Sequence, residues 1–235
     1  MKFFQRKKNN SHLKDLLPNA ISTLRKNLID PFLGEINNIK HADERPPLRS
    51  EIFTKEKLKQ HAVALAKRHV LVYEQTSEQL LKQLAENEDI LLEVYALISD
   101  SIRQNNPIAP AAEWLLDNFY LIEEQIYTGK KHLPKGYSKQ LPRLLKGESS
   151  DIPRVYDMAI EIISHSDGHV NLSSLTAFVN AYQSVSKLKL GELWAIPIML
   201  RLALIENLRR LSLLIAEEIT NKSLANRLSN EMNEI

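Results

Sequence analysis

Apolar residues recur every three or four positions over most of the chain, which is the spacing of one face of an α-helix. No alternation of apolar and polar residues extends far enough to predict a β-strand. The sequence therefore predicts an all-α protein, an irregular multi-helix bundle of about seven helices. The apolar pattern places helices over residues 13–28, 54–73, 77–104, 111–127, 138–146, 153–164, 172–184 and from 191 past 218.

Residues that begin or end helices fall between these segments. Thr54 and Asn171 are suited to cap the first N–H groups of the helices that follow them, and Pro110 fits a first helical turn. Asn-Asn-Pro at 105–107 and Ser-Asp-Gly at 166–168 interrupt the apolar pattern with turn-forming residues. Most helix boundaries can therefore be assigned from local sequence.

The first fifty residues differ from the rest of the chain. Residues 37–50 are polar and contain Pro46 and Pro47, which is typical of a linker. We predict a basic N-terminal arm over residues 1–50, with one amphipathic helix and this Pro-rich linker, and a helical domain over residues 51–235. The basic residues of the arm crowd its first fifteen positions, at Lys2, Arg6, Lys7, Lys8 and Lys14.

Composition and charge exclude several classes of function. Hydrophobic residues make up 43% of the chain and charged residues 26%, as in an ordinary globular protein. A net charge of +2 gives no argument for a nucleic-acid partner, and none is predicted. The chain has no cysteine, which excludes a disulfide, a thiolate zinc site and a cysteine nucleophile.

The most apolar segment, residues 193–215, is tested as a membrane span. It contains Arg201, Glu206, Arg209 and Arg210. An arginine at the centre of a membrane helix costs roughly 2.5–3.5 kcal/mol. We therefore interpret this segment as a buried core helix.

Three lysines, Lys130, Lys131 and Lys135, lie between the glycines of residues 129–136. A phosphate-binding P-loop has a second glycine where this segment has Pro134, and it follows a β-strand, which is not predicted here. A solvated basic loop accounts for the lysines, and a weak anion-binding loop is the alternative.

A pair of histidines, His165 and His169, has the spacing of two metal ligands on one helix. The residues between them, including Asp167, are helix terminators, so the pair is not expected to lie on a helix. Because a tetrahedral site needs further donors, no metal site and no other cofactor is predicted. The simpler interpretation is a polar helix end, with His165 close to the negative end of the helix dipole.

Three carboxylates, Glu113, Asp117 and Glu124, share one face of the helix predicted over 111–127. Paired carboxylates can act as a general acid and base. A charged face opposite an apolar one is also typical of any amphipathic helix, and this is the simpler interpretation.

Arg201 lies among apolar residues of the last helix. A buried charge without a partner is costly, so Arg201 is expected to pair with a carboxylate of Glu113, Asp117 or Glu192. Together with Glu124, these residues form a candidate polar cluster that is either functional or fixes the helix register.

Several sequence stretches together resemble one family. These are AEWLLDNF at 112–119, IEEQI at 122–126, LPKGY at 133–137, PRVY at 153–156, FVNAYQ at 178–183 and LKLGELWAIPIMLRLALIENLRR at 188–210. From about residue 51 to residue 211 the series is similar to the N-terminal region of cyclic β-1,2-glucan synthases, which are large bacterial inner-membrane proteins.

The resemblance implies a family that polymerises glucose from UDP-glucose and closes the chain into rings, with a glycosyltransferase and a phosphorylase-like domain. The chain has neither Asp-x-Asp nor Gln-x-x-Arg-Trp, so no catalytic residue of the family can be assigned to it. The chain alone is not expected to be an enzyme. It is expected to be a non-catalytic helical region on the cytoplasmic side of the bacterial inner membrane, with other domains of the synthase as partners.

Two other functions are open. The chain is alternatively a stand-alone module that binds a partner protein or a membrane surface, the latter through its basic N-terminus, although each basic residue contributes only about 1 kcal/mol on anionic lipid. A small enzyme that uses Glu113, Asp117 and Glu124 is the third hypothesis.

Overall fold

The computed structural model describes residues 45–48, 50–73, 79–133, 136–137, 140–146 and 150–233. The helix predicted over 13–28, and all of the predicted N-terminal arm except residues 45–48 and 50, lie outside these residues. Residues 45–216 form one compact unit, and the part of the last helix from Glu217 onward belongs to a second. The predicted boundary after residue 50 stays a prediction.

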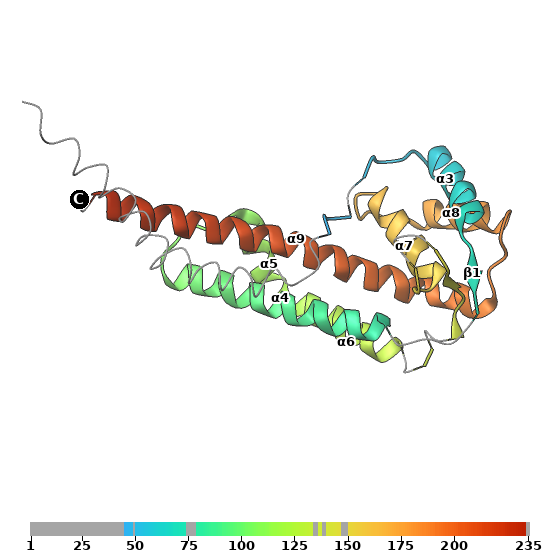
Figure 1. Cartoon of the computed structure of the whole chain (residues 1–235), viewed down its shortest axis with the longest axis horizontal. Coiled ribbons are helices and arrows are strands. Elements are labelled where there is room, and N and C mark those ends of the chain that lie inside the picture. The colour runs from blue at the N-terminus through green and yellow to red at the C-terminus, as the bar shows by residue number, and fades with distance from the viewer. Residues whose placement is uncertain are drawn as a thin grey trace, which may run out of the picture. The chain divides into compact units, whose positions relative to one another are not determined.

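The described part of the chain is built almost entirely from helices, which confirms the predicted all-α bundle (Figure 1). Besides the helices it contains one antiparallel ribbon in which Leu71 lies opposite Leu144. The helices are α3 (Lys55–Arg68), α4 (Gln79–Arg103), α5 (Pro110–Asp117), α6 (Phe119–His132), α7 (Arg154–Ser164), α8 (Leu172–Gln183) and α9 (Leu190–Asn233), and the strands are β1 (Leu71–Val72) and β2 (Arg143–Leu144).

The predicted caps begin and end these helices. The Thr54 hydroxyl accepts a hydrogen bond from the N–H of Lys57, and the Asn171 side chain accepts one from the N–H of Ser174. Pro110 occupies the first turn of α5. After α7, Gly168 adopts a φ of +75°, which a side chain would disfavour.

The core is formed by the apolar faces that the helical spacing marks. On α6, Phe119, Ile122 and Ile126 are buried together with Leu115 of α5. Helices α4, α6 and α9 approach closely at Gly129, where an added Cβ would lie 3.3 Å from Leu84 and 3.5 Å from Leu202. Helix α3 packs against α8.

Helix α9 is apolar on most of its circumference up to residue 205, and most of its side chains there are buried or half-buried. It continues through Pro197 without a break. No helix among the residues that the model describes is long and apolar enough to cross a membrane.

Three predicted elements are wrong in part. The helix expected over 54–73 ends at Arg68, and Leu71 and Val72 form β1. The helix expected over 111–127 is two helices that meet at Asn118, whose φ of −105° and ψ of 10° depart from helical values, and α6 then extends to His132. The short helix expected over 138–146 is wrong at residues 143–144, which form β2. Here the chain pairs with β1, and the N–H of Leu145 donates to Val70 at 2.8 Å, so long-range pairing overrides the local helical spacing.

Candidate interaction surface on α5, α6 and α9

Glu192, one of the predicted cluster residues, lies in the core and not in a cavity. Its carboxylate accepts hydrogen bonds from Arg154 Nε at 2.5 Å and Arg154 Nη2 at 2.8 Å. The two side chains are only 1% and 2% exposed. The N–H of Lys189 also donates to Glu192 Oε2 at 2.9 Å, which caps the start of α9. This pair therefore fixes the start of α7 against the start of α9.

The remaining donors of Arg154 are also satisfied. Its Nη1 donates to Ser186 Oγ at 2.7 Å and its Nη2 to the carbonyl of Lys187 at 2.8 Å. Burial alone would lower the pKa of the Arg154 guanidinium, but the hydrogen bond and the charge of Glu192 outweigh burial and raise that pKa. A fully paired, buried arginine of this kind holds helices in register and is not available to a ligand.

A second buried ionic group lies further along α9. Glu206 accepts hydrogen bonds from Arg209 at 2.9 and 3.2 Å and from Arg210 at 2.7 Å, and all three side chains are less than a tenth exposed. Arg210 also donates to the carbonyl of Pro46 at 2.8 Å. The helical spacing identifies the pair Glu206 and Arg210, but it does not reveal their burial.

The expected carboxylate partner of Arg201 is wrong. Arg201 is half-buried, and its Nε donates to the amide oxygen of Gln125 on α6 at 3.0 Å. Glu192 is held by Arg154 instead. An amide is sufficient here because the guanidinium keeps part of its solvation.

The three carboxylates Glu113, Asp117 and Glu124 are all exposed. None of them lines either of the two hollows described below. The predicted polar cluster is therefore not brought together, and the geometry gives no support to an acid–base pair.

The loop predicted over residues 129–136 is helical at its start, and anion binding by its lysines stays a prediction. Lys130 and Lys131 lie in the last turn of α6, and Lys130 forms an ion pair with Glu88 of α4. The end of a helix presents carbonyl groups and a negative dipole end, which disfavours an anion. Lys135 lies outside the described residues.

Two adjoining hollows open between α9 and the pair α5–α6. The first has a volume of about 390 Å³ and is lined by mostly apolar side chains, among them Trp114, Leu121 and Leu204. The second, about 370 Å³, includes Trp194 and Tyr137. Pro197 and Arg201 line both.

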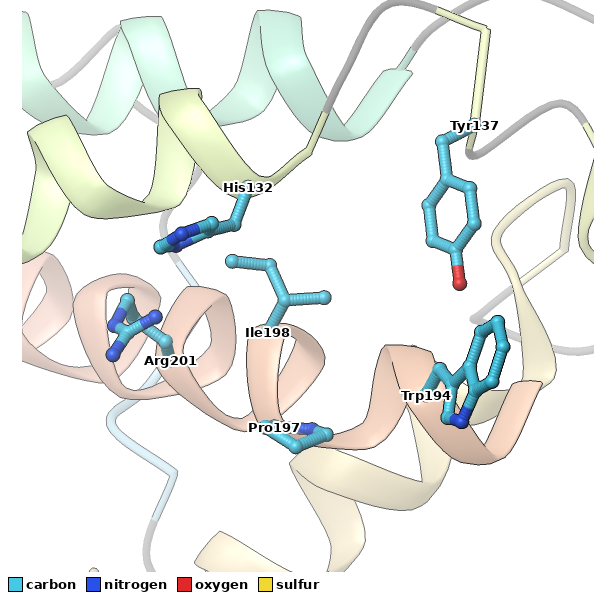
Figure 2. Close-up of a pocket in the computed structure, with 6 residues that line it drawn as sticks. All are labelled: His132, Tyr137, Trp194, Pro197, Ile198 and Arg201. Carbon is cyan, nitrogen blue, oxygen red and sulfur yellow. The ribbon is translucent and has the colours of Figure 1, made fainter. Parts of the chain in front are cut away.

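Figure 2 shows the second hollow, with Trp194 and Tyr137 at one end and Arg201 and His132 at the other. The Tyr137 hydroxyl donates to the carbonyl of Gly191 at 2.7 Å, which ties the segment after α6 to the first turn of α9. Burial raises the pKa of that hydroxyl. The indole of Trp194, in contrast, is largely exposed to solvent.

Several apolar side chains around these hollows are exposed. Trp194 is 72% exposed, Trp114 56%, Leu204 42% and Leu121 40%. We call this surface, formed by Trp114, Leu121, Trp194 and Leu204, the tryptophan face. Exposed apolar patches of this kind mark interaction sites, and tryptophan is enriched at their energetic centres.

The fold and this face define a class: a helical bundle that offers an apolar contact surface on α5, α6 and α9. The chain is 37% identical over 147 residues to the cyclic β-(1,2)-glucan synthase NdvB of Rhizobium meliloti (strain 1021). That alignment covers 63% of this chain and 5% of the synthase, so the chain spans a small fraction of the length of its relative. No protein-family model matches the chain. The chain thus contains a region related to a cyclic β-1,2-glucan synthase, which confirms the resemblance.

Proposed function

We propose that this chain is a non-catalytic helical region of a cyclic β-1,2-glucan synthase that braces the catalytic domains through the tryptophan face. In this proposal it lies on the cytoplasmic side of the bacterial inner membrane, and glucose is polymerised from UDP-glucose by domains outside the chain. The observation that carries the proposal is the 37% identity to a region that amounts to 5% of such a synthase.

The geometry of the described residues supports a contact role over a catalytic one. The buried ion pairs of α7 and α9 are internally satisfied, and the predicted carboxylates are exposed away from the hollows. The tryptophan face, in contrast, presents two large indoles and two leucines to solvent. Covering such side chains with another domain would remove apolar area from water at about 25 cal/mol per Å².

The test is made in the complete protein encoded by the reading frame that contains this sequence. Membranes from cells expressing that protein are supplied with UDP-glucose, and the yield and ring size of cyclic glucan are measured. We expect Trp194→Ala and Leu204→Asp to reduce the yield, because both remove apolar contact area from the tryptophan face without touching a buried residue.

The matched control is Tyr127→Ala on α6, since Tyr127 is 66% exposed but lines neither hollow. This variant is expected to retain full glucan synthesis. Unchanged yield and ring size in both Trp194→Ala and Leu204→Asp would contradict the proposal, as would an equal loss in the control.

A further inference from the structure

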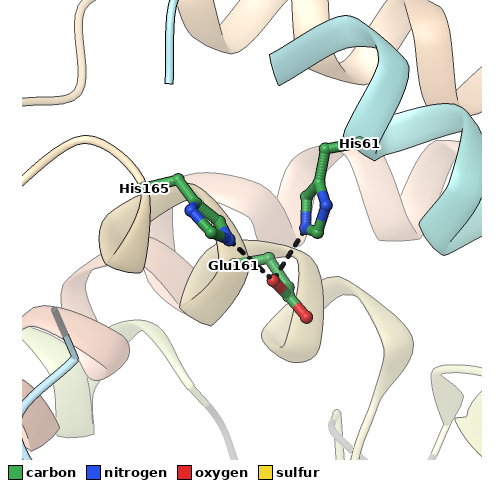
Figure 3. Close-up of side chains that lie close together, drawn as sticks. All are labelled: His61, Glu161 and His165. Atoms are coloured by element: carbon green, nitrogen blue, oxygen red, sulfur yellow. Dashed lines mark hydrogen bonds and ion pairs between the residues drawn. The ribbon is translucent and has the colours of Figure 1, made fainter. Parts of the chain in front are cut away.

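Two histidines and one glutamate, from segments far apart in the sequence, lie close together between α3 and the end of α7. His61 lies on α3, Glu161 on α7, and His165 directly follows α7. His61 Nε2 lies 2.8 Å from Glu161 Oε2, and His165 Nε2 lies 3.6 Å from the same oxygen. Figure 3 shows both rings directed at this carboxylate, and the three donor atoms lie within 4.8 Å of one another.

The backbone sets the tautomer of His165. Its Nδ1 lies 2.8 Å from the carbonyl oxygen of Glu51, which can only accept, so Nδ1 carries the hydrogen. In the neutral ring Nε2 then offers its lone pair to the cluster. A histidine that binds a metal donates its other ring N–H to just such a carbonyl. The contact between His165 and Glu51 is held in place by a second hydrogen bond, because the N–H of Phe53 donates to the carbonyl of His165 at 3.0 Å.

Neighbouring side chains orient the other two donors. Arg68 donates to Glu161 Oε1 at 2.9 Å, which leaves Oε2 directed at the histidines. The ring of Phe53 stacks on His165 with centroids 3.7 Å apart and meets the edge of His61 at 5.4 Å.

Hydrogen bonding among the three residues does not account for their arrangement. One shared proton satisfies His61 and Glu161 at 2.8 Å, whereas 3.6 Å between His165 Nε2 and Glu161 Oε2 is too long for a hydrogen bond. When His165 is neutral and its hydrogen is on Nδ1, the lone pairs of Nε2 and of Glu161 Oε2 face each other across this gap, and a coordinated cation would fill it.

We propose that His61, Glu161 and His165 bind one divalent transition-metal ion of the zinc class, with a coordination position left open for water. Metal–donor bonds of about 2.0–2.1 Å in a tetrahedral site place neighbouring donors about 3.3 Å apart. The observed 2.8 and 3.6 Å lie on either side of that spacing, so small side-chain rotations complete the site. Two imidazoles and one carboxylate favour a zinc-like ion over magnesium or calcium, which prefer oxygen donors.

The side chains of His61, Glu161 and His165 are 22%, 20% and 12% exposed, so an ion can reach them from solvent. The ion would link α3 to the end of α7. This inference concerns a part of the chain separate from the tryptophan face, and it holds whether or not the chain braces a synthase.

The test uses the purified chain, stripped with a chelator and titrated with zinc chloride by calorimetry, with cobalt(II) as a spectroscopic probe. We expect one zinc per chain and the strong visible absorption of four-coordinate cobalt. His61→Gln and His165→Gln are expected to weaken zinc binding at least about tenfold. His169→Gln is the matched control, because His169 is exposed and lies outside the cluster, and it is expected to bind as the wild type does.

Circular dichroism of each variant verifies that the helices persist, and Glu161→Gln provides a third ligand substitution. Zinc affinity unchanged by His61→Gln and His165→Gln would overturn the proposal. A wild-type cobalt spectrum identical to that of the aquated ion would also overturn the proposal, and this measurement needs no variant. Equal weakening by His169→Gln would indicate general binding to surface histidines and would overturn it as well.

Discussion

Removal of the Glu192 carboxylate tests whether the buried ion pair between α7 and α9 holds the core together. Glu192→Ala leaves the Arg154 guanidinium 2% exposed and without its anion. Two charge-assisted hydrogen bonds are lost, at 2.5 and 2.8 Å, and each is worth about 1.5–3 kcal/mol. The two remaining bonds of Arg154, to Ser186 and to the carbonyl of Lys187, are to neutral groups and cannot compensate its charge.

The expected loss in the free energy of unfolding is therefore about 3–5 kcal/mol, the range typical of breaking a buried pair from one side. For a protein of this size each kcal/mol shifts the Tm by about 2–4 °C, so the Tm should fall by about 6–20 °C. Urea and thermal unfolding, followed by the helical circular dichroism signal, measure both quantities.

A second variant separates the buried charge from simple loss of packing. Arg154→Met combined with Glu192→Leu removes both charges and keeps similar side-chain volume, so it should be more stable than Glu192→Ala alone. Glu124→Ala, on an exposed carboxylate, is the control and should change the free energy by no more than about 0.5 kcal/mol. A loss below about 1 kcal/mol in Glu192→Ala, or a double variant no more stable than the single one, would refute the reasoning.

Three other changes give distinct signatures. The hydrogen bonds and charges of Arg209 and Arg210 outweigh burial and hold the pKa of Glu206 below its ordinary value. Its contribution to the free energy of unfolding is therefore complete above the unfolded pKa and is lost as the pH falls through the folded pKa. Unfolding measured as a function of pH should show a shallower loss of stability in acid for Glu206→Gln than for the wild type. Gly129→Val should lower the free energy of unfolding in urea by about 1–3 kcal/mol, because even a Cβ would lie 3.3 Å from a side chain of α4. An unchanged free energy of unfolding would contradict the close packing of the helices at this position. Asn171→Ala should cost about 1 kcal/mol and more than Thr54→Ala, since the cap bonds are 2.8 and 3.3 Å long; the opposite order in thermal melts would contradict this.

Only part of the candidate sites can be predicted from the sequence. The apolar spacing of residues 188–210 marks a core helix, but the exposed Trp194 within it looks like any other apolar residue. Arg154 gives no local signal of its burial, because its partner Glu192 is 38 residues away. His165 is visible as a possible ligand, yet the sequence pairs it with His169, whereas the fold brings it to His61.

The local structure follows from the amino-acid sequence, because helical spacing, the Thr54 and Asn171 caps, and the stop after α4 depend on interactions within a few residues. The relation to a cyclic β-1,2-glucan synthase is also visible in the sequence, as an alignment over 147 residues. The partner of each charge, and which apolar side chains stay in water, are set by the folded arrangement of the helices. Those outcomes depend on contacts between distant segments, as when residues 143–144 pair with β1 and leave the helical pattern of their neighbours.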